Sequence, residues 1–467
     1  MTFAEKHVHF IGIGGIGMSG IAALMLRLGV TVTGSDTKPS DVTRRLESRG
    51  AAVAYGQRPE NIPTDTELVV VTAAIKPDNP ELIEANRRGI AVQKYAQVLG
   101  RVALQFRTIA VSGTHGKTTT TAMVTCMLRK MGLDPSYVVG AAVGSLGGSS
   151  GVGQGEHFVV EACEYDRSFL NLHPCVAVIN NIEEDHLDYY RDIGEIQEAF
   201  AQFASQVDPT GLLVVNAGDP RALEAARHAP SEVQTFGIGV EADWRADKLE
   251  SARGQFAFDV SFRGKRLGRC ELGIPGKHNV SNALASLACA RWAGVSMEQS
   301  RKVLKTFRGA DRRFQKVAEV GGITVVDDYA HHPTEIAATL EAARAYFAAR
   351  RIWVVFQPHQ HSRTRFFLEE FAHSFSHADV VIVPQIYFVR DTEEDRRSVT
   401  AEDLVARMKA LHRDARHIAD FDEIVRVLRC GLQTGDVVIT MGAGPINQVG
   451  RDLVEALGIP DSSRSAG

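Results

Sequence analysis

Residues 108–119 read Thr-Ile-Ala-Val-Ser-Gly-Thr-His-Gly-Lys-Thr-Thr, and this stretch decides the fold. Its apolar beginning predicts a buried strand over residues 108–111, and the amphipathic stretch after it predicts a helix over residues 118–131, ended by Gly132. A glycine-rich loop between a strand and a helix is typical of a phosphate-binding P-loop, because backbone N–H groups and the helix start both face the anion. The sequence therefore predicts an α/β fold built around a phosphate site.

The loop supplies the side chains that a nucleoside triphosphate requires. Lys117 can reach the β and γ phosphates, and Thr118 can face Mg²⁺. The first glycine of the usual Walker pattern would fall at Val111, so the loop is a variant, and the alternative interpretation is an ordinary glycine turn before a helix. The residues predicted to bind ATP here are Gly113, Thr114, His115, Gly116, Lys117, Thr118 and Thr119.

Length and charge limit the kinds of protein that the chain can be. Its 467 residues predict about three domains. Hydrophobic residues make up 44% and charged residues 23%, which is ordinary for a soluble globular protein. The net charge of -4 gives no basic field, so we expect no nucleic-acid partner.

Cysteine usage and hydropathy predict a location in the cell. No two of the six cysteines form a CxxC pair, which argues against a zinc site or a disulfide framework and favours a reducing compartment. We see no signal-peptide pattern and no apolar run near the roughly 18 residues that a membrane span needs. The expectation is a cytoplasmic protein that does not insert into membranes.

The strand and helix pattern restarts twice along the chain. We predict an N-terminal Rossmann-like domain over residues 1–106, a central P-loop ATPase domain over 107–308 and a C-terminal Rossmann-like α/β domain over 309–467. Residues 144–155 are rich in glycine and serine and are predicted to be a loop without an element of its own.

The N-terminal domain opens with a second glycine-rich turn. A strand over residues 7–11 leads into the turn at 12–17, and a second strand ends near Asp36, which is the layout of a Rossmann-like βαβ unit. This turn suits a dinucleotide or any other pyrophosphate, and it could also serve only for tight packing of the helix on the strand. By itself it would favour an NAD-dependent dehydrogenase, but that interpretation leaves the P-loop unexplained.

Acids and a histidine follow two further predicted strands. Glu161 ends a strand over residues 158–161, and Asp185 and His186 follow a strand over residues 176–179. Because ligands of α/β sheets bind at the carboxyl ends of the strands, Thr118, Glu161 and His186 are predicted to hold Mg²⁺ beside the phosphates. Solvated acids and a structural histidine are the alternative.

The predicted third domain also carries polar segments after its strands. Two acids, an aromatic residue and paired histidines follow the strand over residues 323–326, and Arg363 follows the strand over residues 352–356. An arginine at a strand end suits carboxylate recognition, because its guanidinium pairs with both oxygens. Ordinary polar surface is the other interpretation of both segments.

Taken in order, these segments resemble the Mur ligase family over residues 7–444, nearly the whole chain. The matching residues are Gly12-Ile13-Gly14-Gly15-Ile16-Gly17-Met18-Ser19-Gly20, Gly34-Ser35-Asp36, Gly113 to Thr119, Glu161, Asn181-Ile182 with Asp185-His186, Gly276-Lys277-His278-Asn279, Arg312-Arg313-Phe314, Asp328-Tyr329 with His331-His332-Pro333-Thr334-Glu335, and Met441-Gly442-Ala443-Gly444.

The resemblance implies a reaction and its partners. The first domain would bind the UDP of a nucleotide sugar, the second MgATP, and the third would close over the site and present an amino acid. The chain looks most like the branch of the family that phosphorylates the lactyl carboxylate of UDP-N-acetylmuramate and lets L-alanine attack the acyl phosphate, a step of peptidoglycan synthesis. We expect a monomer or a homodimer.

The resemblance also implies roles for individual residues. Lys117, His186, Arg363 and His332 would be catalytic, with Arg363 near the carboxylate of the incoming amino acid. Asn279 would contact the adenine, and Arg313 and Asp328 would also bind ATP. The UDP-sugar would contact Gly14, Gly15, Ile16, Gly17, Met18, Ser35, Asp36 and Ala74.

The chain departs from the family pattern at two positions. Cys163 stands where many relatives have aspartate, and Gln360 stands where many have arginine. A ligase of the same family that attaches a whole tripeptide to UDP-N-acetylmuramate is the nearest alternative, and a non-catalytic nucleotide-binding regulator is a further one. Neither the preference for L-alanine over glycine or L-serine nor the oligomeric state is fixed by the sequence.

The absence of lysine from one long stretch of the chain predicts how a metal would be held. Several relatives that add later amino acids use a carbamylated lysine to bridge magnesium, but no lysine lies between Lys130 and Lys248 in this chain. We therefore expect the metal nearest the γ-phosphate to be held without a modified lysine.

Overall fold

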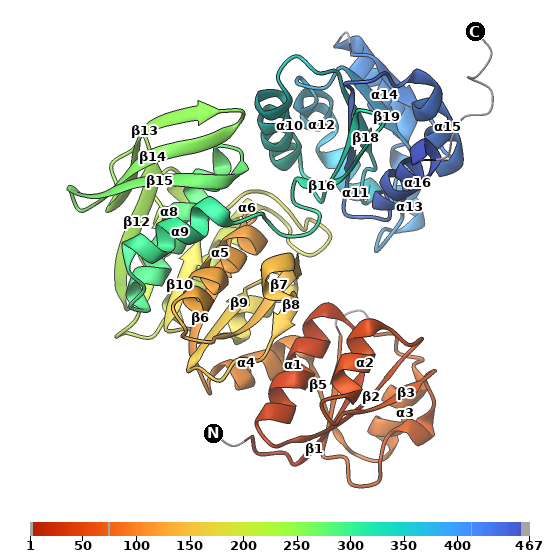
Figure 1. Ribbon diagram of the computed structural model, residues 1–467. Coiled ribbons are helices and arrows are strands. Elements are labelled where there is room, and N and C mark those ends of the chain that lie inside the picture. The colour runs from red at the N-terminus through yellow and green to blue at the C-terminus, as the bar shows by residue number, and fades with distance from the viewer. Residues whose placement is uncertain (1–2, 73–74, 412, 459–467) are drawn as a thin grey trace.

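The protein folds into three α/β lobes, each built around its own sheet (Figure 1). A computed structural model describes residues 3–72, 75–411 and 413–458. The predicted three-domain α/β fold is confirmed. Among the described residues, no helix is long and apolar enough to cross a membrane.

The N-terminal sheet is parallel, with the strand order β3-β2-β1-β4-β5. The glycine-rich turn joins β1 to α1, as the sequence predicts. The elements are β1 His7–Ile11, α1 Ile16–Arg27, β2 Thr31–Asp36, α2 Asp41–Glu47, β3 Ala52–Tyr55, the 3₁₀ turn η1 Pro59–Asn61, β4 Leu68–Val71, α3 Pro80–Arg87, β5 Ala91–Lys94 and α4 Tyr95–Ala103.

The central sheet has the order β15-β14-β13-β12-β11-β10-β6-β9-β7-β8, with β6 and the P-loop near its middle. Its elements are β6 Arg107–Ser112, α5 Lys117–Lys130, β7 Ser136–Val143, η2 Gly144–Leu146, β8 Gly148–Gly151, β9 His157–Glu161, η3 Tyr165–Asn171, β10 Val176–Ile179, α6 Ile193–Ser205, β11 Leu212–Asn216, α7 Pro220–Ala226, β12 Glu232–Ile238, β13 Trp244–Ala252, β14 Gln255–Phe262, β15 Lys265–Pro275, α8 His278–Trp292 and α9 Met297–Thr306.

The C-terminal sheet has the order β16-β17-β21-β18-β19-β20 and is parallel except for the β16–β17 pair. Its elements are β16 Gln315–Val320, β17 Ile323–Asp328, α10 Pro333–Phe347, β18 Ile352–Phe356, α11 His361–Phe366, α12 Leu368–Ser374, β19 Val380–Val383, α13 Glu393–Ser398, α14 Ala401–Ala410, β20 Ala415–His417, α15 Phe421–Gly431, β21 Val437–Met441 and α16 Asn447–Gly458.

The glycine- and serine-rich segment at residues 144–155 is not the plain loop that its composition predicts. It contains η2 and the strand β8, which pairs antiparallel with β7. A helix from the N-terminal domain packs on this strand, and a Cβ atom added at Gly20 of α1 would lie 3.0 Å from the Cβ of Ser150. The prediction was wrong because this packing and the pairing with β7 order a segment whose local sequence is flexible.

The first two domains share one apolar core, and the C-terminal domain has cores of its own. One buried cluster runs without a break from Val8 and Phe10 in the N-terminal domain to Phe158 and Phe203 in the central domain. The C-terminal domain has its own clusters on the two faces of its sheet. The N-terminal and central domains therefore share apolar packing, whereas the C-terminal domain meets its neighbour mainly through polar contacts.

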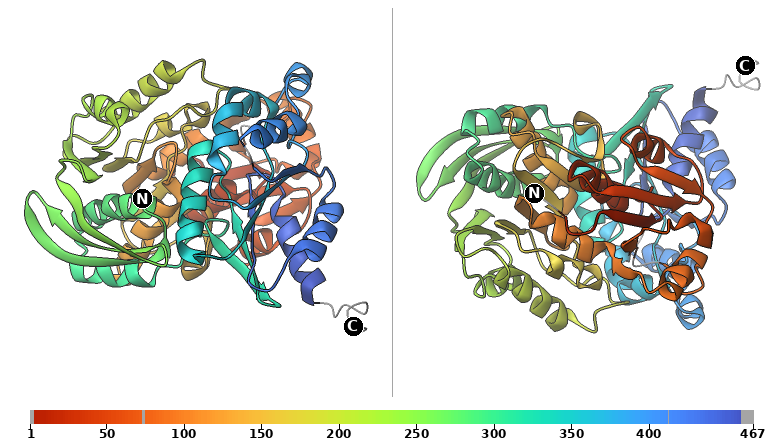
Figure 2. Two further views of the ribbon diagram at one scale, coloured as in Figure 1. Left: turned by 90° about the horizontal axis from the view of Figure 1, so that it is seen from above. Right: turned by 90° about the horizontal axis from the view of Figure 1, so that it is seen from below.

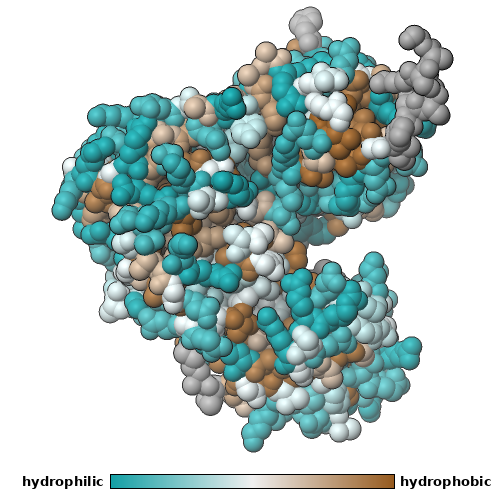
Figure 3. Space-filling model, in the orientation of Figure 1, coloured by the Kyte–Doolittle hydropathy of each residue, from teal (hydrophilic) through white to brown (hydrophobic). Residues whose placement is uncertain are grey.

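The outer domains lie on the same side of the central domain (Figure 2). The space-filling view shows a hollow between the N-terminal and C-terminal lobes, with the central domain bounding it on the left (Figure 3). An ion pair between Lys94 Nζ and Asp166 Oδ2, at 2.7 Å, also joins the N-terminal domain to the central domain.

Candidate active site

A cavity of about 960 Å³ lies between the central and C-terminal domains. Its volume is in the range that nucleotides and other cofactors fill. The lining includes the P-loop, the start of α8 and the start of α10, with His115, Gly116, Thr118, Thr119, Asn181, Glu183, His278, Asn279, Arg313, Asp328, His332 and Glu335 among its residues.

The P-loop needs glycine for two reasons. Gly116 has a φ of +82° and stands directly before α5, and a Cβ atom there would lie 2.4 Å from Asn282 Oδ1. Gly113 has a φ of +128°, and its Cβ would lie 2.8 Å from the Cβ of Asn180. A side chain at either position would be strained and would also clash. The backbone can therefore close around an anion only with this sequence.

Lys117 is buried and paired with a carboxylate. Its Nζ lies 2.9 Å from both oxygens of Glu164 and donates to the carbonyl oxygens of Gly113 and Thr114 at 2.6 and 3.1 Å. Burial by itself would lower the pKa of Lys117, but the surrounding negative charge, that of Glu164 first, raises the pKa above its usual value. Lys117 is therefore a permanent cation in the phosphate-binding loop.

Thr118 and Glu161 lie side by side, as a metal site requires. The hydroxyl of Thr118 donates to Glu161 Oε2 at 2.9 Å, and the N–H of Gly140 donates to the same oxygen at 2.8 Å. His186 has a left-handed backbone, with a φ of +53°, and its buried Nδ1 has no hydrogen-bond partner. Burial lowers the pKa of His186, so its ring is neutral at pH 7 and suited to bind a metal.

Arg363 reaches from the C-terminal domain to the central domain. Its Nη2 donates to Asp185 Oδ1, and both side chains are at least nine-tenths buried. Burial would raise the pKa of Asp185, but the guanidinium of Arg363 holds it well below the usual value. The predicted partner of Arg363 was an amino-acid carboxylate, and the structure gives it a carboxylate of the protein.

His115 joins the P-loop to the C-terminal domain. Its Nδ1 lies 3.1 Å from Glu335 Oε1, and its Nε2 lies 3.4 Å from Glu183 Oε2. Burial would lower the pKa of His115, but its pairing with the carboxylates of Glu183 and Glu335 raises the pKa to about 9. The pKa of Glu183 falls to about 2, because the pairing with His115 outweighs burial. An ion-pair cluster therefore holds this junction.

The cavity lining also contains the residues predicted to bind the rest of ATP. Asn279 donates from Nδ2 to the carbonyl oxygen of Pro275 at 2.6 Å. The guanidinium of Arg313 lies 5.1 Å from the centre of the Tyr329 ring. Asp328 accepts from the N–H groups of Phe314 and Ala330, both at 2.7 Å, and burial raises its pKa to about 6. All three predicted residues line the cavity, but Asp328 already uses its carboxylate to shape the backbone.

The glycine-rich turn at residues 12–17 belongs to the N-terminal domain and is not part of the cavity lining. Gly14 is half-buried and Gly15 is exposed, and Ile16 at 53% exposure is accessible to a ligand. Asp36 Oδ2 accepts from the N–H of Gly14 at 2.8 Å.

Other residues predicted to bind the UDP-sugar are less accessible than Gly15 and Ile16 where the structure describes them. Ser35 is fully buried and its hydroxyl donates to Glu81 Oε2 at 2.6 Å, so its side chain supports the turn from inside. Met18 is also buried, and a side chain at Gly17 would meet the ring of Tyr95. Ala74 lies outside the described residues.

Sequence reasoning missed four residues of the site. Glu164 and Glu335 stand inside segments that the sequence singles out, but nothing local showed that they pair with Lys117 and His115. Glu183 lies two residues after Asn181 and lines the cavity. His278 precedes Asn279, and burial lowers its pKa to about 4. Glu335 and His278 belong to segments that match the family, which was an available signal, whereas position near a polar segment was the only signal for Glu164 and Glu183.

Models of known families match almost the whole chain. Residues 7–107 match the description "Mur ligase family, catalytic domain", residues 111–290 the "Mur ligase middle domain", and residues 312–444 the "Mur ligase, glutamate ligase domain".

Individual proteins match over the same length. UDP-N-acetylmuramate--L-alanine ligase of Caldanaerobacter subterraneus subsp. tengcongensis is 44% identical, over 96% of this chain and 97% of that protein. The crystal structure of UDP-N-acetylmuramate-alanine ligase from Thermotoga maritima superposes with a TM-score of 0.80 at 29% identity, over 96% of this chain and 98% of that one. A murein peptide ligase from Psychrobacter arcticus superposes with a TM-score of 0.72 at 27% identity, over 98% of this chain and the whole of that one.

The fold and the site together define a three-domain P-loop ligase, in which the third domain completes the cavity of the second. The chain belongs to the Mur ligase family.

The Lys117→Ala variant should lose turnover by at least about 10²–10³-fold, because a buried cation that offsets developing charge is removed. Lys130→Ala, at the exposed end of the same helix, is the matched control and should turn over normally. The double variant Lys117→Ala/Glu164→Gln separates catalysis from folding, since it leaves no unpaired charge. Near-normal phosphate release by Lys117→Ala would contradict the P-loop assignment.

The His115 cluster should make the folded protein less stable at alkaline pH. Because the pKa of His115 rises from 6.5 to about 9 on folding, its stabilising effect is complete below pH 6.5 and is lost as the pH rises through about 9. The thermal midpoint of the wild type should therefore fall more between pH 6.5 and 9.5 than that of His115→Asn. His228→Asn, at an exposed histidine, should behave like the wild type. Parallel curves for wild type and His115→Asn would refute this role.

Proposed function

We propose that this chain is an ATP-dependent ligase that joins L-alanine to the lactyl carboxylate of UDP-N-acetylmuramate, in the synthesis of peptidoglycan precursors. The full-length similarity to curated ligases of this specificity, at 41–45% identity, supports the substrates. The reaction would run through an acyl phosphate, because a carboxylate needs its oxygen converted into a leaving group before an amine can displace it.

One observation carries the proposal, namely a row of charged groups that crosses from the P-loop to the C-terminal domain. Lys117 Nζ lies 2.9 Å from Glu164 Oε1, and this oxygen lies 3.7 Å from His186 Nε2. His186 Nε2 lies 3.8 Å from Asp185 Oδ2, and Asp185 pairs with Arg363. A phosphate on Lys117 and an amino acid beside Arg363 would thus bind at the two ends of this row. The lactyl carboxylate would lie between them, where it accepts the phosphoryl group and is then attacked by the amine as phosphate leaves.

The protein groups have separate tasks in such a reaction. Lys117 would bind the transferred phosphate and offset its charge. Arg363 would orient the carboxylate of the amino acid, and the C-terminal domain would keep water from the acyl phosphate. The N-terminal turn at residues 12–17 would bind the UDP, because its backbone N–H groups lie before a helix.

The residues present fit a magnesium ion. Thr118 and Glu161 offer oxygens 2.9 Å apart, and the unpartnered Nδ1 of the buried His186 ring marks this side chain as available for a ligand contact. These three side chains would hold Mg²⁺ without a modified lysine. When bound, Mg²⁺ would neutralise charge on the phosphate oxygens.

The murein peptide ligase similarity favours a second candidate, the attachment of a whole peptide to UDP-N-acetylmuramate. Phosphate release decides between them when the chain is given UDP-N-acetylmuramate, ATP, Mg²⁺ and either single amino acids or a tripeptide. Release that depends on L-alanine supports the proposal, and release with the tripeptide alone contradicts it. Glycine and L-serine in the same assay measure the preference among small amino acids.

Arg363→Ala should raise the KM for L-alanine by about 30-fold to several thousand-fold, because losing a buried charged partner costs about 2–5 kcal/mol. The KM for ATP should change far less. Arg365→Ala is the matched control, since Arg365 lies two residues further along the same short helix and its side chain is 56% exposed. An unchanged KM for L-alanine in Arg363→Ala would rule out the proposed contact.

A further inference from the structure

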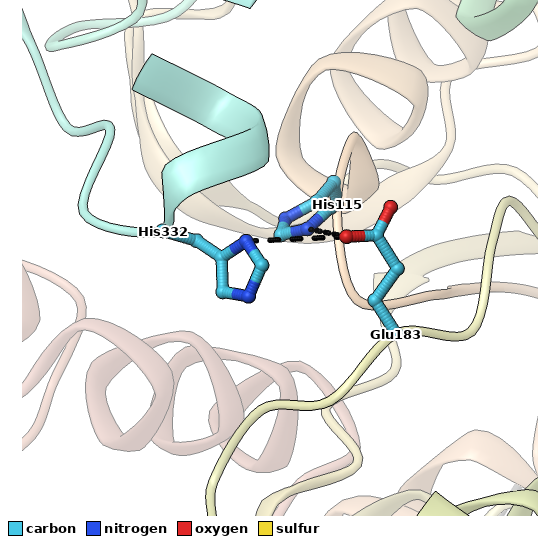
Figure 4. A group of neighbouring side chains, drawn as sticks. All are labelled: His115, Glu183 and His332. Atoms are coloured by element: carbon cyan, nitrogen blue, oxygen red, sulfur yellow. Dashed lines mark ion pairs between the residues drawn. The ribbon is translucent and has the colours of Figure 1, made fainter. Parts of the chain in front are cut away.

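Two histidines and a glutamate meet at the junction of the central and C-terminal domains (Figure 4). His115 comes from the P-loop, Glu183 from the segment after β10, and His332 from the position before α10. One ligand atom from each residue lies within 4.8 Å of the others. This group is separate from Thr118, Glu161 and His186, which would hold magnesium.

The hydrogen bonds of the two histidines fix which nitrogens can bind a metal. His115 Nδ1 donates to the carboxylate of Glu335 at 3.1 Å, and His332 Nε2 donates to the carbonyl oxygen of Glu184 at 3.0 Å. A carboxylate and a carbonyl can only accept, so each ring carries its proton on that side. In neutral rings the lone pairs then belong to His115 Nε2 and His332 Nδ1, and both nitrogens lie next to Glu183. His332 Nδ1 also accepts a hydrogen bond from the N–H of Thr334 at 3.3 Å, which caps α10 and which a bound metal would replace.

This arrangement is the one found around bound metals. Metal-binding histidines commonly donate their other N–H to a carboxylate or a backbone carbonyl, which orients the ring. Glu335 and Glu184 supply one of each. His115 Nε2 is also buried and has no hydrogen-bond partner. Glu183 Oε2 is oriented by the hydroxyl of Thr334, which donates to it at 2.7 Å.

The distances suit a small borderline cation. His115 Nε2 lies 3.4 Å from Glu183 Oε2, and His332 Nδ1 lies 3.9 Å from the same oxygen. Tetrahedral zinc with bonds of about 2.0–2.1 Å places its ligands about 3.3 Å apart. The ligand atoms are separated by up to 4.8 Å, so the group is wider than a zinc shell and side-chain rotations would have to close it.

We propose that His115, Glu183 and His332 form a binding site for Zn²⁺ or a similar divalent transition metal, which bridges the central and C-terminal domains. Imidazole nitrogens select these metals over Mg²⁺. The metal displaces the proton between His115 Nε2 and Glu183, and its fourth position opens to the cavity. Because its ligands come from both domains and one belongs to the P-loop, the bound metal locks the two domains together and competes with nucleotide entry.

Direct titration of the full chain with Zn²⁺, without nucleotide or UDP-sugar, tests the site independently of the ligase reaction. Glu335→Gln removes only a partner of the ligand His115, so it should weaken the binding of one equivalent of zinc by about 10–100-fold. Glu183→Gln and His332→Asn each remove a proposed ligand and should each weaken that binding by more than this. Co²⁺ should give the visible absorption of a tetrahedral complex in the wild type and lose it in the first two variants.

Two matched variants make the result decisive. Glu184→Gln keeps the carbonyl that His332 uses and should bind Zn²⁺ as the wild type does. Glu161→Gln removes a predicted magnesium ligand and should also leave this zinc equivalent intact. Zinc binding that survives Glu183→Gln but is lost in Glu161→Gln would overturn the proposal, and so would equal losses in Glu183→Gln and Glu184→Gln. Zinc should also raise the thermal midpoint of the wild type but not that of His332→Asn, since only the wild type is bridged.

Discussion

The buried ammonium group of Lys117 is the constraint on which the rest of the site depends. A cation held away from water needs a nearby counter-charge, and Glu164 provides it at 2.9 Å. The backbone of Glu164 is in turn fixed by the hydroxyl of Tyr190, which donates to its carbonyl oxygen at 2.6 Å. The strands β6, β9 and β10 end around this pair, so their carboxyl ends bring the P-loop, the acids and His186 to one place. An arriving phosphate would share the charge of Lys117 with Glu164.

The junction with the C-terminal domain follows a different physical rule. The apolar core is continuous between the first two domains, but the C-terminal domain keeps its own clusters and meets the P-loop through ion pairs and hydrogen bonds. His115 with Glu335, and Arg363 with Asp185, are the main contacts. Polar interfaces between domains permit relative motion more readily than large apolar ones. The same residues that line the site thus also dock the domain, and binding in the cavity is coupled to docking.

Local patterns predicted much of the fold, because buried parallel strands and glycine turns leave strong signals. The strands over residues 7–11, 176–179 and 352–356 have the predicted bounds. The strand β8 could not be predicted, since its order comes from β7 and α1 and not from its own residues. The site also combines what a local pattern predicts with what only the fold creates. Lys117 and Thr118 follow from the P-loop pattern. The pairing of His115 with Glu183 and Glu335 could not be predicted, because it joins residues far apart in sequence. Ser35 belongs to a segment that matches the family, but only the structure shows that its hydroxyl points inward to Glu81.

Ligand chemistry separates the two cation sites that these residues would form. Thr118 and Glu161 offer oxygens beside the phosphate-binding loop, and hard ions such as Mg²⁺ prefer oxygen ligands completed by water and phosphate. The cluster of His115, Glu183 and His332 offers two nitrogens and one oxygen, a set that suits Zn²⁺ and would bind Mg²⁺ poorly. The magnesium site also includes one nitrogen, from His186, but two of its three side chains offer oxygens, whereas two of the three in the other cluster offer nitrogens. Because the nitrogen-rich set lies on the domain junction, occupation by a transition metal would change domain docking and leave the magnesium ligands in place.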